Sequence, residues 1–113
     1  MSGITTHVLD TARGQPASGV PITLEFKTAG SWKLIGEAAT DADGRAERLV
    51  SQGVKLHRGT YRIRFDTAAY FSAQQTESFY HEVTVVFLVK DPRQHYHVPL
   101  LLSPFGYTTY RGS

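Results

Sequence analysis

The amino-acid sequence predicts an all-β protein, an antiparallel β-sandwich of about eight strands with one short helix. Short stretches alternate between apolar and polar residues, as strands with one buried face do. Glycine, proline and aspartate turn signals separate these stretches about every ten residues. At 113 residues, of which 41% are hydrophobic, the chain is expected to form a single domain over residues 1–113 around one core.

The first two predicted strands flank a loop rich in glycine and small residues. Residues 4–10 alternate, so one face of this strand carries Ile4, Thr6 and Val8 and the other carries Thr5, His7 and Leu9. Residues 20–27 give the most regular alternation in the chain. The side predicted to face the core there consists of Val20, Ile22, Leu24 and Phe26.

Two further strands follow in the middle of the chain. A hairpin turn at residues 29–31 precedes a strand over residues 32–39, in which Trp32 and Leu34 are predicted to face the core. The Asp-Ala-Asp-Gly stretch after it has the composition of a turn. It leads into residues 45–50, whose short and polar character predicts an edge strand.

The next segment contains the helix. Residues 60–66 alternate as a strand, and residues 67–75 follow with helix-forming residues behind a capping Asp66 or Thr67. Residues 83–89 are apolar at nearly every position, which predicts a strand covered on both faces. In so small a domain, the second cover is expected to be another subunit.

The C-terminal stretch joins an apolar strand to a basic and aromatic tail. In residues 95–103, one face is predicted to be core, with Tyr96, Val98, Leu100 and Leu102, and the other presents His95 and His97. A Ser-Pro-Phe-Gly turn leads into a final strand over residues 107–111. A hairpin here would bring the tail back beside His97.

Composition excludes several classes of protein. The chain has no cysteine, so disulfides, thiolate zinc sites and a cysteine nucleophile are ruled out. The net charge of +2 comes from basic residues scattered singly, which argues against nucleic-acid binding. The N-terminus has no signal-peptide pattern and no apolar run is long enough to span a bilayer, so we expect no membrane association and a cytoplasmic location.

The paired histidines admit three interpretations. With His7 as a third ligand they have the spacing of a zinc site. They are equally suited to metal-free acid–base catalysis beside a basic residue, and they could also be ordinary surface histidines. The turn before Arg45 resembles the start of a calcium loop, but Arg45 occupies a position that needs an oxygen ligand, so calcium is rejected. Arg45 is therefore either a solvated edge charge or an anion clamp.

Four stretches together resemble the 5-hydroxyisourate hydrolase family, which is related to transthyretin. They are Thr6-His-Val-Leu-Asp10, Thr40-Asp-Ala-Asp-Gly-Arg45, His95-Tyr-His-Val-Pro-Leu-Leu-Leu-Ser103 and Tyr110-Arg-Gly-Ser113. The terminal tetrapeptide is the most specific of the four. One departure is His81, which stands where the family usually has proline before Glu-Val.

The resemblance implies a transthyretin-like sandwich that assembles as a homotetramer, a dimer of dimers with sites at the dimer–dimer interface. It implies hydrolysis of 5-hydroxyisourate to 2-oxo-4-hydroxy-4-carboxy-5-ureidoimidazoline in urate breakdown, without metal or cofactor. Residue by residue, the family's catalytic positions fall on His7, Arg45, His97 and Ser113. Its substrate-binding positions fall on His7, Arg45, Tyr110, Arg111 and Gly112. The alternative is a transthyretin-like carrier that binds a small aromatic ligand without catalysis.

Overall fold

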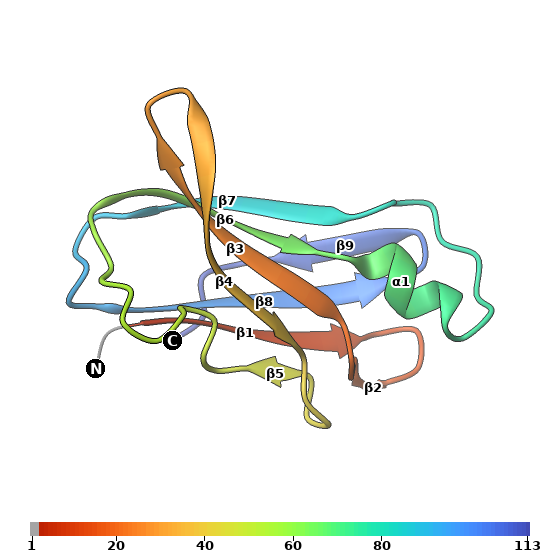
Figure 1. The fold of residues 1–113 in the computed structure, drawn as a ribbon. Helices are drawn as coiled ribbons and strands as arrows, with labels where there is room; N and C mark the ends of the chain where they lie inside the picture. The colour runs from red at the N-terminus through yellow and green to blue at the C-terminus, as the bar shows by residue number, and fades with distance from the viewer. Residues whose placement is uncertain (1–2) are drawn as a thin grey trace.

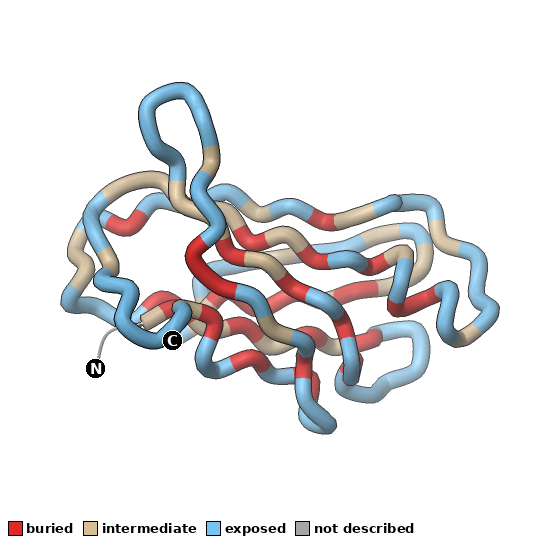
Figure 2. The backbone as a smooth tube through the Cα atoms, in the orientation of Figure 1, coloured by how far each residue is buried: buried red, intermediate tan, exposed pale blue. Residues whose placement is uncertain are grey.

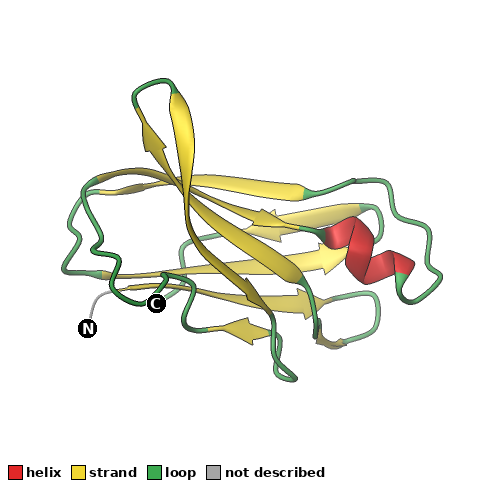
Figure 3. Cartoon of the chain, in the orientation of Figure 1, coloured by secondary structure: helices red, strands yellow, loops and turns green. Residues whose placement is uncertain are grey.

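The computed structural model describes residues 3–113 as two packed β-sheets and one short helix (Figure 1, Figure 3). The first sheet has the order β2-β1-β8-β9, with β5 also paired to β1, and its strands are β1 (Gly3–Asp10), β2 (Gln15–Pro16), β5 (Arg45–Ala46), β8 (His95–Ser103) and β9 (Gly106–Thr109). The second sheet has the order β4-β3-β6-β7, and its strands are β3 (Pro21–Thr28), β4 (Ser31–Ala39), β6 (Gly59–Phe65) and β7 (Val83–Val89). The predicted β-sandwich with one helix is confirmed.

The core lies between the two sheets because each main strand turns its apolar side inward (Figure 2). One of the two alternating faces of β1, β3, β6 and β8 is buried, except for Phe26 on β3, which is partly buried. The buried set is Ile4, Thr6, Val8, Val20, Ile22, Leu24, Tyr61, Ile63, Phe65, Tyr96, Val98, Leu100 and Leu102. The tip of the β3–β4 hairpin projects beyond the sandwich and is exposed (Figure 2).

The prediction for β4 is wrong at Leu34. Leu24 pairs with Gly36 but Glu25 pairs with Leu34, so Ile35 is an extra residue that forms a β-bulge. Because side chains alternate along a strand, one extra residue reverses the faces beyond it. Leu34 is consequently 49% exposed, while Ile35 is buried.

Three other boundaries differ from the prediction. The edge strand expected over residues 45–50 is limited to β5, and the last strand ends at Thr109. The helix α1 (Thr67–Ser72) ends three residues early, but its predicted cap is confirmed, since Asp66 Oδ1 accepts a hydrogen bond from the Ala69 amide at 3.1 Å. Among the described residues, no helix is long and apolar enough to cross a membrane.

One strand pair departs from the antiparallel arrangement. β1 runs parallel to β8 along its whole length, from the pair Gly3–His95 to the pair Asp10–Leu102. The connection between them contains the whole second sheet, so no local turn in the sequence indicates this pairing. The pairing is nevertheless what places residues of β1 beside the two histidines of β8.

β7 lies at one end of the second sheet and has an open outer face. Val86 is 57% exposed and Leu88 is 52% exposed. The single chain therefore covers one face of this strand, and the cover expected for the outer face, a second subunit, stays a prediction.

A buried carboxylate joins the first sheet to the helix. Asp10 is 1% exposed, and its Oδ1 accepts hydrogen bonds from the amides of Ala12 and Arg13, both at 3.1 Å. Its Oδ2 accepts a hydrogen bond of 2.8 Å from the hydroxyl of Tyr70 in α1. Asp10 thus stabilises the β1–β2 turn and the position of the helix at the same time.

Replacing Asp10 by alanine should lower the free energy of unfolding by about 2–4 kcal/mol, because two amides and a buried hydroxyl lose their acceptor. Tyr70→Phe should have a smaller effect, since the carboxylate then keeps both backbone donors. Urea unfolding followed by circular dichroism measures both values. A larger loss in Tyr70→Phe than in Asp10→Ala would contradict this account of the turn.

Candidate active site

A cavity of about 450 Å³ opens on the outward face of the first sheet. Side chains from β1, β8, the segment that begins with β5, and the C-terminal tail surround it. Those that carry chemistry are Thr5, Arg45, Glu47, His95, His97 and Ser113. Three of the predicted site residues, Arg45, His97 and Ser113, therefore meet at one cavity.

Strand pairing explains how residues distant in sequence meet here. In the parallel pair, Thr5 lies opposite His97 and Gly3 lies opposite His95. On the other side of β1, His7 pairs with Arg45 of β5. The tail returns along β8, where Gly112 bridges to His97. The sequence predicted the return of the tail but did not predict that Thr5 lines this cavity.

The His97 side chain is half-buried, and one of its two ring nitrogens has a defined hydrogen-bond partner. Its Nδ1 lies 2.8 Å from the Thr5 Oγ1. Burial lowers the pKa of His97 below its ordinary value of 6.5, and the positive charges of Arg45 and of the neighbouring imidazoles lower it further. His97 is therefore neutral at pH 7 and can accept a proton.

The lowered pKa predicts the pH at which His97 titrates. In a proton NMR titration, the His97 ring signal should change with a midpoint below pH 6.5, because the folded protein disfavours the imidazolium. Arg45→Gln should move this midpoint upward, since it removes a nearby positive charge. A midpoint above 6.5 in the wild type, or a downward shift in the variant, would contradict the assignment.

His7 lies on the same outward face but is oriented by a different partner. Its Nε2 is 2.8 Å from the backbone carbonyl of Asp43. A carbonyl oxygen can only accept a hydrogen bond, so His7 Nε2 must carry a proton. In the neutral ring the remaining acceptor is then Nδ1. The structure places His7 beside the cavity rather than in its lining.

The tail packs against His97 through Gly112. The Gly112 amide donates a hydrogen bond of 2.8 Å to the His97 carbonyl oxygen. A Cβ atom at Gly112 would lie 2.6 Å from His97 Cδ2 and 3.1 Å from Pro99 Cγ. Such a distance is too short for two carbon atoms, so glycine is required if the ring is to keep its place.

Tyr110 and Arg111 face a second, more apolar cavity of about 250 Å³ between β7 and the tail. The Arg111 guanidinium lies 4.6 Å from the centre of the Tyr96 ring, a cation–π contact. His97 lines this cavity as well as the first one. These two predicted binding residues therefore line the second cavity and not the main one, and His97 is common to both linings.

The zinc interpretation required His7 as a third ligand. Within residues 3–113, no three His, Cys, Asp or Glu side chains gather closely enough to hold one metal ion. His7 directs its Nε2 to the Asp43 carbonyl. The geometry of the three histidines therefore gives the zinc interpretation no support.

Comparison with known proteins agrees with this geometry. The model of the HIUase/Transthyretin family matches residues 4–112. The chain belongs to this family. A probable 5-hydroxyisourate hydrolase of Caenorhabditis elegans is 47% identical over 112 residues, which cover 99% of this chain and 82% of the relative. The resemblance seen in the sequence is thus confirmed for the whole chain.

Two solved structures of the HIUase/Transthyretin family show the same fold. The 5-hydroxyisourate hydrolase of Klebsiella pneumoniae superposes with a TM-score of 0.87 at 33% identity, covering 100% of both chains. The transthyretin of Sparus aurata superposes with a TM-score of 0.91 at 35% identity, covering 99% of this chain and 97% of that chain. The fold is therefore common to an enzyme and to transthyretin, so side chains must distinguish the two functions.

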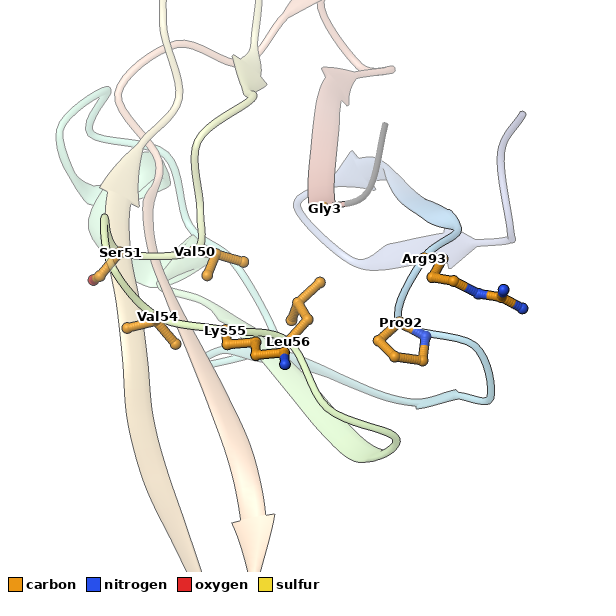
Figure 4. Close-up of a pocket in the computed structure, with 8 residues that line it drawn as sticks. All are labelled: Gly3, Val50, Ser51, Val54, Lys55, Leu56, Pro92 and Arg93. Carbon is orange, nitrogen blue, oxygen red and sulfur yellow. The ribbon is translucent and has the colours of Figure 1, made fainter.

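A third cavity, of about 490 Å³, adjoins the first at Gly3 (Figure 4). It lies between the segment joining β5 to β6 and the turn joining β7 to β8. Its lining includes Val50, Leu56 and Pro92, and the Arg93 side chain extends away from it (Figure 4). No imidazole or carboxylate side chain lines this cavity among the residues described. It lacks the acid–base groups of the first cavity.

Proposed function

We propose that this protein is a 5-hydroxyisourate hydrolase, which opens a cyclic amide of its substrate to give 2-oxo-4-hydroxy-4-carboxy-5-ureidoimidazoline in urate degradation. The observation that carries the proposal is the meeting of neutral His97 with Arg45 at one cavity. Similarity over the whole chain to proteins named 5-hydroxyisourate hydrolase supports the choice of substrate.

Each site residue has its own role in the reaction. His97 Nε2, the ring nitrogen that is not beside Thr5, accepts a proton from water as the water attacks the ring carbonyl. Arg45 stabilises the negative charge that develops on the carbonyl oxygen and binds the urate-like edge of the substrate. Ser113 orients water or substrate, and His7 assists His97. No step requires a metal or a cofactor.

The tail completes the site. Gly112 lets the chain pass close to the His97 ring, and Tyr110 and Arg111 bind substrate from the side of the second cavity. In the single chain these two side chains line the second cavity and Arg45 lines the first, with His97 common to both. Their role as substrate-binding residues therefore rests on a site to which neighbouring subunits contribute.

The test is a spectrophotometric assay. 5-Hydroxyisourate is generated from urate with urate oxidase, and its ultraviolet absorbance is followed with and without the protein and with a chelator. Decay that is accelerated by the protein and survives the chelator supports a metal-free hydrolase. Decay at the spontaneous rate would refute the enzyme and favour the carrier, whose ligand would then be sought by binding assays in the same cavities.

We also propose that the protein assembles as a homotetramer, with the cavity face of the first sheet at the dimer–dimer interface. β7 and β9 are end strands of their sheets, and both contribute to the lining of the second cavity, so the two edges lie on the same side of the sandwich. Exposed apolar residues gather along this side, among them Phe79, Tyr80, Val86, Leu88 and Tyr107. Edges and apolar patches of this kind are the usual sites of subunit contact.

Val86→Asp should shift the protein from tetramer to smaller species in sedimentation velocity, because it places a charge on the exposed apolar face of β7. The matched control is Leu34→Asp, which changes an apolar residue of similar exposure on β4, at the opposite end of the second sheet. The control should remain tetrameric. Equal sedimentation of the wild type and both variants would place the interface elsewhere.

A single domain over residues 1–113 and a cytoplasmic location remain proposals from the sequence. Limited proteolysis tests the first, since a single domain should show no stable internal cleavage product. Subcellular fractionation of the source cells tests the second.

A further inference from the structure

The hydroxyl of Thr5 lies between the rings of two histidines. Its Oγ1 is 2.8 Å from His97 Nδ1 and 2.9 Å from His95 Nε2. His95 is exposed and His97 is half-buried, and all three groups line the main cavity. The parallel pairing of β1 with β8 creates this arrangement, because it sets Thr5 opposite His97 and two residues along β1 from Gly3, which lies opposite His95.

The hydroxyl has a single proton, so the protonation states of the His95 and His97 rings depend on each other. When Thr5 donates to His95 Nε2, it accepts from His97 Nδ1–H, and the neutral His97 then has a free lone pair on Nε2. When His95 Nε2 carries the proton, Thr5 accepts from it, and its own proton is free to be donated to His97 Nδ1. His97 then holds its proton on Nε2, where it faces the substrate as a donor.

We propose that Thr5 is a positioning residue that selects the basic tautomer of His97 and relays protons between His97 and His95. The inference rests on the proposed hydrolase function, in which His97 Nε2 must alternate between accepting and donating a proton. Neither Thr5 nor His95 is among the residues that the family resemblance assigns to the site.

The proton balance of the relay closes over one turnover. Water gives a proton to His97 Nε2, His97 passes its Nδ1 proton to Thr5, and Thr5 passes its own proton to His95 Nε2. His97 is then neutral with a proton on Nε2, and the charge rests on exposed His95. Transfer of that Nε2 proton to the leaving ring nitrogen lets the relay run back, so Thr5 and both histidines end unchanged.

Other charged groups act on the same rings and affect any pH profile. His7 on β1, the strand beside β8, and Arg45 on β5, which pairs with β1, both oppose a positive charge on His97. Glu47 and Arg48 line the cavity beyond Arg45, and Arg111 lies in the tail. A fixed positive charge near His97 makes it favourable to move the proton outward to His95.

The test compares Thr5→Val, which keeps the shape of the side chain but has no hydroxyl, with Thr5→Ser, which keeps the hydroxyl. Thr5→Val should lower kcat about tenfold or more with little change in KM, because the ring loses its orientation and its relay. Thr5→Ser should restore most of the activity. Thr23→Val, on the second sheet, is the matched control and should behave as the wild type.

A second readout does not depend on turnover. Nitrogen-15 NMR distinguishes the two neutral tautomers of His97, and the wild type should populate the form protonated on Nδ1, whereas Thr5→Val should shift toward a mixture. Identical tautomer populations in wild type and Thr5→Val would overturn the proposal. If the wild type fails to hydrolyse 5-hydroxyisourate, the proposed function fails, and the tautomer comparison still decides the role of Thr5. Wild-type turnover in Thr5→Val would refute the relay while leaving the hydrolase intact.

Discussion

Replacing His97 by alanine should lower the kcat for 5-hydroxyisourate hydrolysis by about 10²- to 10⁴-fold, the usual contribution of a general base. The midpoint of thermal unfolding should change little, because the His97 side chain lies outside the core and only half-buried on the sheet surface. The separation of the two effects is the point of the experiment: a residue that acts in catalysis changes turnover without changing stability.

His81→Ala is the matched control for His97→Ala. His81 is exposed and lies in the segment before β7, outside the lining of the main cavity. Its replacement removes an imidazole of the same size and should leave both turnover and thermal unfolding at wild-type values. Near-wild-type turnover in His97→Ala would rule out His97 as the base and direct attention to His7.

Gly112→Ala should reduce hydrolysis by about 10²-fold, a loss typical of misplacing a catalytic group by about 1 Å. The added methyl group would lie 2.6 Å from His97 Cδ2 and 3.1 Å from Pro99 Cγ, while the Gly112 amide remains bound to the His97 carbonyl oxygen. The tail cannot move away without losing that hydrogen bond, so the His97 ring must shift. Steady-state assays on the purified variant measure the loss.

Gly106→Ala provides the control for the glycine substitution. A Cβ atom at Gly106 would meet its nearest neighbour, Ser103 Oγ, at 3.7 Å, an ordinary van der Waals distance. This variant should keep wild-type turnover although it also adds one methyl group to the C-terminal hairpin. If Gly112→Ala and Gly106→Ala turn over at the same rate, the close approach of the tail has no role in holding His97.

Local patterns in the sequence were sufficient for most of the fold. Alternation identifies the inward faces of β1, β3, β6 and β8, because burial of one face of a strand imposes a period of two. The cap at Asp66 was predictable because capping depends on neighbouring residues. The bulge that exposes Leu34 was not, because it depends on how β4 pairs with β3 and leaves no mark in the alternation of β4 by itself.

The candidate site likewise has features that local sequence predicts and features that only the tertiary structure decides. The sequence determined that His95 and His97 share an outward face and that the final hairpin returns the tail to them, because strand alternation and turn chemistry are local. Only the tertiary structure decided that β1 pairs in parallel with β8 and that β5 brings Arg45 to the cavity. Strands separated by most of the chain are joined by packing of the whole sandwich, and no short stretch of sequence records that pairing. For this reason Thr5, which lies within hydrogen-bond distance of both histidines, stands about ninety positions from them along the chain.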